Sequence, residues 1–164
     1  MRTLFLVALA ACHSLSFTYA PDFPAADQAG LEDARKAWDG IVKPGYRLSL
    51  GAGWTDWTVV RVAPVSGYNG YTSNADHVIQ ITPTPRAPAG QTPPTVFAIA
   101  LHEMGHALGL FHTCTTSDPQ EKAAPGSPPC DPLVSFGVMD PTHPSSLPFT
   151  VADMAECRRV GSCR

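Results

Sequence analysis

The sequence contains few charged residues and no long apolar run. Charged residues make up 15% of its 164 residues, the net charge is −3, and no block of like charges occurs. A nucleic-acid-binding surface needs a basic stripe, and because none is present we exclude nucleic acid as a partner. The longest apolar run, Leu4 to Cys12, is too short to span a bilayer. The sequence therefore predicts no membrane-spanning helix.

The chain does have enough apolar material to bury a core. Hydrophobic residues make up 44% of the sequence, and the length favours a single domain. The 13 glycines and 17 prolines predict long, loop-rich connections. We expect one globular domain.

The first residues have the pattern of an export signal. Arg2 precedes an apolar stretch of signal-peptide length, so residues 1–11 are interpreted as a signal peptide of a secreted protein. A buried strand or helix is the alternative. Residues 12–25 are interpreted as a leader, a tether or a short pro-segment, and residues 26–164 as the folded domain.

The site of signal cleavage is left open by the sequence. Leu9-Ala10-Ala11-Cys12 is similar to the lipobox of bacterial lipoproteins, which would place a lipid anchor on Cys12 and the protein on the cell surface. Ordinary cleavage near Ala10 or Ala20 is the other possibility.

The hydrophobic periodicity predicts helices and strands in a mixed order. Helices are expected at 26–42, 93–108 and 150–160, strands at 46–50, 57–62, 67–73 and 77–82, and Pro-rich loops at 83–92 and 114–136. Pro93 suits the first turn of the second helix, and Thr150 is placed to cap the third.

The second helix carries the residues that indicate chemistry. His102 and His106 are four residues apart, so on a helix both imidazoles lie on one face and can bind one zinc ion. Gly109 is placed to end the helix in a sharp turn that returns His112 as a third ligand. Glu103 is adjacent, suited to act on a metal-bound water. Three nitrogen ligands leave one position for water, which is typical of catalytic zinc; coincidental surface histidines are the alternative.

This segment resembles the zinc signature of the metzincin metallopeptidases. Thr113, after the last histidine, is similar to the Ser or Thr that matrixins have there, and differs from the Glu of astacins. Phe136-Gly137-Val138-Met139-Asp140-Pro141 is similar to the metzincin Met-turn, with Met139 beneath the zinc. Pro141 stands where astacins have a tyrosine ligand. The resemblance implies an α+β, metzincin-like zincin fold: a small twisted mixed sheet, an active-site helix, a Met-turn and a C-terminal helix.

The implied function is a secreted or lipid-anchored zinc metalloendopeptidase. One zinc ion would be held by His102, His106 and His112, and Glu103 would be the general base toward the zinc-bound water. The alternatives are a catalytically idle surface binding module of the same fold, and a zinc hydrolase acting on a non-peptide bond. The expected partner is a protein or peptide substrate, and the chain is expected to act as a monomer.

Substrate contacts are implied by the same resemblance. Matrixins pair an edge strand with the substrate backbone, and the candidate here is the 67–73 strand with Gly70 and Tyr71. Pro141-Thr142-His143 lies where the family has Pro-x-Tyr in its pocket wall, so His143 replaces the tyrosine. A solvent-exposed loop histidine is the alternative for His143.

The remaining residues bear on further metal sites, on disulfides and on latency. Asp76 and His77 are too few for a second closed zinc site, and no acidic cluster supports calcium, which stays possible. Cys114, Cys130, Cys157 and Cys163 form an even set that indicates two disulfides, with 114–130 and 157–163 favoured by proximity. Asp22, or an unlipidated Cys12, is a candidate to hold the enzyme latent; a plain surface tether is the alternative.

Overall fold

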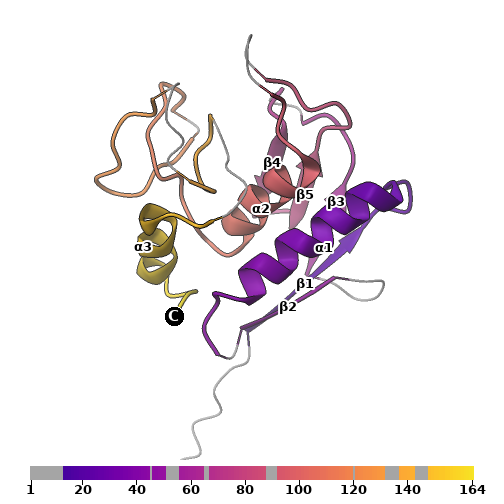
Figure 1. The fold of residues 1–164 in the computed structure, drawn as a ribbon, viewed down its shortest axis with the longest axis horizontal. Helices are drawn as coiled ribbons and strands as arrows, with labels where there is room; N and C mark the ends of the chain where they lie inside the picture. Colours follow the sequence, from indigo (N-terminus) through magenta and orange to yellow (C-terminus); the bar gives the residue numbers. More distant parts are fainter. Residues whose placement is uncertain are drawn as a thin grey trace, which may run out of the picture.

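The computed structural model describes residues 13–44, 46–50, 56–64, 67–87, 92–119, 121–131, 137–142 and 148–164. Its elements in chain order are β1 (His13–Tyr19), α1 (Ala25–Asp39), β2 (Tyr46–Leu50), β3 (Trp57–Val60), β4 (Gly70–Ser73), β5 (Val78–Ile81), α2 (Val96–Ala107) and α3 (Val151–Arg159) (Figure 1). The α+β class is confirmed. Every helix and strand expected from the sequence has a counterpart, and most of them are shorter than expected. The expected signal peptide, residues 1–11, and Cys12 lie outside the described residues.

One five-stranded sheet organises the chain. Its order is β2-β1-β3-β5-β4. β1 pairs in parallel with β2 and β3, and β3 pairs in parallel with β5. Only β4 is antiparallel, pairing with β5 so that Gly70 lies opposite Ile81 and Ser73 opposite Val78. β4 is therefore an edge strand, and its outer side is not covered by another strand of this sheet.

Residues 13–19 belong to the segment that we interpret from the sequence as a leader, a tether or a short pro-segment. These residues form β1, an inner strand between β2 and β3. Leu15, Phe17 and Tyr19 alternate with Ser16 and Thr18, which is the period-two signal of a strand. Signal cleavage near Ala20 would remove this strand, so the structure disfavours that site.

Helices α1 and α2 cover the sheet and pack on each other. α1 lies against β2, and α2 lies against β4 and β5 (Figure 1). Leu31, Ala34 and Trp38 are the buried face of α1. The Trp38 indole Nε1 donates to the carbonyl oxygen of Leu101 at 2.7 Å, because a buried indole N–H needs an acceptor. The two helices are thus joined by apolar packing and by one buried hydrogen bond.

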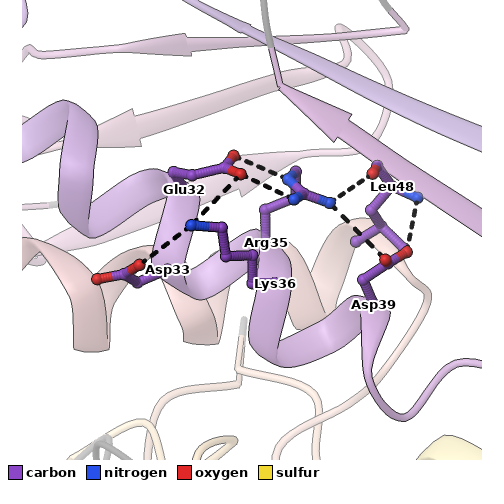
Figure 2. A network of polar contacts seen from close by, with 6 residues as sticks. All are labelled: Glu32, Asp33, Arg35, Lys36, Asp39 and Leu48. Carbon is purple, nitrogen blue, oxygen red and sulfur yellow. Dashed lines mark hydrogen bonds and ion pairs between the residues drawn. The ribbon is translucent and has the colours of Figure 1, made fainter.

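Polar contacts tie α1 to the edge of β2 (Figure 2). The Arg35 guanidinium donates to both oxygens of Glu32 at 2.8 Å and to the Leu48 carbonyl oxygen at 2.7 Å. Asp39 Oδ1 accepts from the Leu48 backbone N–H at 3.4 Å. Arg35 therefore fixes the exposed side of α1 against the sheet, on elements that carry no proposed site residue.

The part of the chain that follows α2 is held together by local contacts and two disulfides. Thr150 and Asp153 form a reciprocal capping box at the start of α3. Disulfides join Cys114 to Cys130 and Cys157 to Cys163, the pairing that sequence proximity favoured. Within the described ranges, no helix combines the length and the apolar character that crossing a membrane requires.

Candidate active site

Helix α2 places two histidines and a glutamate side by side. The helix begins at Val96, with Thr95 as N-cap accepting from the Ala98 N–H at 3.2 Å; the expected start at Pro93 is therefore too early. His102 and Glu103 are buried and His106 is half-buried. The side chain of Leu101 is fully buried in the core, so α2 presents the two histidines from a firmly packed helix.

A glycine turn brings the third histidine back. Gly109 has φ +90°, a conformation that glycine adopts without steric cost. The Leu110 N–H donates to the Gly105 carbonyl oxygen at 3.0 Å, which closes the helix end. His112 then lies beside the helical pair: its Nε2 is 3.3 Å from that of His102 and 3.0 Å from that of His106.

The three imidazoles fit a tetrahedral zinc ion. The remaining Nε2–Nε2 distance, His102 to His106, is 3.1 Å. Zn–N bonds of 2.0–2.1 Å at tetrahedral angles place ligand nitrogens about 3.3–3.4 Å apart. Three neutral nitrogen donors at this spacing would hold zinc and leave a fourth position open.

Backbone carbonyls orient two of the ligands. His102 Nδ1 is 2.7 Å from the Val138 carbonyl oxygen, and His106 Nδ1 is 2.9 Å from that of Leu110. A carbonyl oxygen only accepts, so each Nδ1 carries the proton and each Nε2 offers its lone pair. Among the described residues, the buried Nδ1 of His112 has no hydrogen-bond partner.

Burial keeps the ligand histidines neutral. Burial, with a smaller contribution from the neighbouring histidine, lowers the pKa of His102, His106 and His112 to about 3 in each case. Neutral imidazole is the form that binds metal. At neutral pH the site is therefore ready to bind a cation.

Glu103 is held by strand β4. The Thr72 hydroxyl oxygen lies 2.6 Å from Glu103 Oε2 and 3.1 Å from the Glu103 carbonyl oxygen. Burial raises the pKa of Glu103 to about 7, and the Thr72 hydrogen bond acts in the lowering direction. A carboxyl group with this pKa can take up and release a proton near neutral pH. Thr72 is a site residue that the sequence reasoning missed; its only signal is its place in the expected 67–73 strand.

Gly70 lets β4 approach Glu103 closely. A Cβ added at Gly70 would lie 2.4 Å from Glu103 Oε1 and 2.7 Å from Ile99 Cγ2, so no larger residue fits without displacing the carboxylate. The expectation that Gly70 lies at the site agrees with this contact. Tyr71 is 47% exposed, and strand alternation places its side chain on the opposite face from Gly70 and Thr72. The side chain of Tyr71 therefore points away from Glu103.

Met139 lies directly beneath the histidine helix. It is fully buried, and a Cβ added at Gly105 would lie 2.3 Å from its sulfur. The Thr113 N–H donates to the Met139 carbonyl oxygen at 3.0 Å. The side chain of Asp153 accepts from the N–H groups of Val138 and Met139 at 3.0 and 2.9 Å. Asp153, the capping-box residue of α3, therefore also holds the turn that contains Met139.

Glu156 braces the segment before the third ligand. Its Oε1 accepts from the Phe111 N–H at 2.9 Å, and its Oε2 accepts from Arg159 Nε at 2.5 Å. Glu156 is 3% exposed. Burial is the largest single effect on its pKa and raises it, but the hydrogen bonds from Arg159 and Phe111 together outweigh burial, so the pKa is lowered. Glu156 therefore fixes the turn that precedes His112. The sequence reasoning also missed this residue.

Comparisons with known proteins bear on the fold alone. No family model matches the sequence, and no curated protein matches it. Among solved structures, high choriolytic enzyme 1, a hatching enzyme zinc-protease from Oryzias latipes (medaka fish), matches with a TM-score of 0.51 and 16% sequence identity. The match covers 92% of this chain and 90% of that chain. The chain has a metzincin-like zincin fold.

The remaining expected site residues lie around this zincin core. Pro141 is half-buried and Thr142 is exposed; Asp140 Oδ1 accepts from both the N–H and the hydroxyl of Thr142 at 2.8 Å. Phe136 and His143 lie outside the described residues. The pocket wall at Pro141-Thr142-His143 therefore stays a prediction.

Asp76, His77 and Asp22 are not part of the cluster formed by the three histidines. His77 stacks on Trp57 with ring centroids 5.0 Å apart, and Asp76 accepts from the Ser73 hydroxyl at 2.6 Å. Asp22 is exposed in the turn between β1 and α1. The role of its carboxylate in latency stays a prediction. A second grouping, Cys114, Cys130 and Asp140, is no ligand set because its cysteines are disulfide-bonded.

Proposed function

We propose that this chain is a secreted zinc-dependent endopeptidase. One observation carries the proposal: three Nε2 atoms stand 3.0–3.3 Å apart beside a buried carboxylate that an edge strand holds by hydrogen bond. A metal-binding face, a proton acceptor and a free strand edge thus meet at one place. A binding module has no need of the proton acceptor.

The chain's own residues supply three parts of the reaction. His102, His106 and His112 would hold zinc, which when bound supplies a Lewis acid for the scissile carbonyl and lowers the pKa of the attacking water. Glu103 takes the water's proton and passes it to the leaving amine. Thr72 fixes the carboxylate that does so, and Met139 supports the histidine helix from below.

The backbone of β4 is arranged to bind a peptide. The Thr82 N–H donates to the Asn69 carbonyl oxygen at 2.9 Å, and Asn69 precedes the Gly70–Ile81 pair. In an antiparallel ladder such hydrogen-bonded pairs alternate with pairs whose groups point outward. Gly70 and Thr72 therefore direct their N–H and C=O groups to the free edge, where an extended peptide would pair antiparallel, beside Glu103.

Within the metzincin class we propose a matrixin-like enzyme. Thr113 follows the last ligand and Pro141 stands two residues after Met139, the features of the matrixin resemblance. The hatching-enzyme structure shares the fold at 16% identity, which is silent on this subdivision.

Export is supported by the two disulfides, since such bonds persist in oxidising compartments. We propose that residues 1–11 direct secretion, and that Cys12 is a lipidation site if cleavage precedes it.

The proposal is tested by hydrolysis assays on the purified full chain. Casein and a set of short casein-derived peptides serve as substrates, with bound zinc measured in parallel. We expect cleavage by the parent and at least a 10²-fold loss in Glu103→Gln at equal zinc content. Glu32→Gln, the same change on α1, is the matched control and retains activity. Zinc bound at one equivalent with no cleavage of any substrate would favour the idle binding module.

A further inference from the structure

A hydrogen bond joins the segment that precedes β4 to the loop that follows His112. The Tyr68 hydroxyl donates to a carboxylate oxygen of Asp118. Tyr68 lies two residues before Gly70, and Asp118 lies six residues after His112. The hydrogen bond with Asp118, followed by burial, raises the pKa of Tyr68 to about 12, so the hydroxyl keeps its proton at physiological pH. We call this Tyr68–Asp118 contact the strap.

The loop that presents Asp118 is anchored at both ends. The Cys114–Cys130 disulfide closes it. The His112 N–H donates to the Lys122 carbonyl oxygen at 3.0 Å, and the Ala124 N–H donates to that of His112 at 2.8 Å. Thr115 pairs with Pro128 and Cys130 through backbone hydrogen bonds. The loop is therefore fixed to the third ligand itself, and the strap connects the metal-binding side of the site to the sheet edge.

The strap lies beside the start of β4. Gly70 and Thr72 are the strand residues whose backbone groups point outward, and both contact Glu103. Tyr68 lies two residues before Gly70, in the bend that leads into β4, so it is at most about 7 Å from that residue along the chain. A peptide that pairs antiparallel with β4 runs in the opposite direction. Its C-terminal part therefore leads from Glu103 toward Tyr68.

We propose that the strap limits the substrate to about two residues beyond the cleaved bond, so the enzyme prefers bonds close to the C-terminus of short peptides. This inference rests on the proposed peptidase function. A longer substrate must break the Tyr68–Asp118 hydrogen bond in order to bind. Tyr68 and Asp118 are then specificity-determining residues that take no part in the chemistry.

Two peptides of equal N-terminal sequence test the strap. They carry two or five residues after a bond identified by mass spectrometry of the peptide digest. For the parent we expect kcat/KM to fall about tenfold from the shorter to the longer peptide, the effect of breaking one hydrogen bond to a charged group. Tyr68→Phe and Asp118→Ala, which each remove one partner of the hydrogen bond, should reduce this ratio to within about twofold. The matched control is Tyr19→Phe on β1, which removes a hydroxyl that donates to Gln28 Oε1 at 3.1 Å. This variant should keep the ratio of the parent.

A binding measurement separates this inference from the function beneath it. The same peptides are titrated calorimetrically into zinc-loaded Glu103→Gln, with and without Tyr68→Phe. Cleavage by the parent with equal kcat/KM for both lengths overturns the strap and leaves the peptidase standing. If no peptide is cleaved, the peptidase proposal fails. In that case a tenfold difference in Kd between the two peptides that Tyr68→Phe abolishes still supports the strap. Equal Kd values for the two peptides overturn the strap.

Discussion

The Thr72 hydroxyl lies 2.6 Å from Glu103 Oε2 and links the edge strand to the proposed general base. The hydrogen bond favours the charged carboxylate, against the burial that raises its pKa to about 7. Because the base must be deprotonated, activity falls as pH drops through the pKa of Glu103. Thr72→Val removes the stabilising contact, so the acid limb of kcat/KM should move to higher pH. Thr58→Val on β3 is the control; an unmoved acid limb in Thr72→Val would contradict this role.

The metal-free chain should lose stability in acid. The folded-state pKa values of His102, His106 and His112 are lowered to about 3 from 6.5. Between these values the unfolded chain binds more protons, so stability present above pH 6.5 is lost as pH falls toward 3. Glu103, whose pKa is raised, opposes this trend with one group against three. Thermal unfolding in the presence of chelator should show that the stability of the parent falls steeply as pH is lowered, and that the stability of the triple His→Asn variant falls less. Equal pH dependence of stability in the two proteins would contradict the burial of neutral histidines.

Gly105 leaves room for Met139, and a larger residue should not fit. A Cβ there would lie 2.3 Å from the Met139 sulfur and 3.0 Å from the Trp38 ring. Gly105→Ala should therefore destabilise the fold by about 1–3 kcal/mol, although alanine is the better helix former. At Gly40, which has φ −65° and nearest contacts of 3.4 Å, the same change should be neutral or stabilising. Urea unfolding of the two variants decides; equal stabilities would refute the close contact.

Removing β1 should prevent folding. A chain that starts at Ala25 lacks the strand between β2 and β3, and with it the buried Phe17. A chain that starts at His13 keeps the sheet and should fold. Circular dichroism and cooperative thermal unfolding distinguish the two, and cooperative unfolding of the shorter chain would show that β1 is dispensable.

Local patterns predicted what depends on local geometry. The spacing of His102, His106 and His112 around Gly109 is a helix-and-turn property, so the sequence alone indicated the ligand triangle. The alternation of Leu15, Phe17 and Tyr19 was also readable, but the adjacent signal-like segment led to its interpretation as a leader.

What the sequence could not predict are contacts made by packing. Thr72 and Gly70 reach Glu103 only because β4 lies against α2. Asp153 reaches the Met139 backbone only when α3 returns to that turn, and Tyr68 finds Asp118 across 50 residues of chain. No single-sequence pattern specifies these pairings.

The central claim is that one ion at the three histidines makes this chain a peptidase. The most direct measurement titrates zinc into the metal-free chain while recording bound zinc and peptide hydrolysis together. We predict that hydrolysis is absent at first, rises with the first equivalent of zinc and saturates at one zinc per chain, and that His112→Asn abolishes both signals. Full hydrolysis in the metal-free chain, or in His112→Asn, would contradict it.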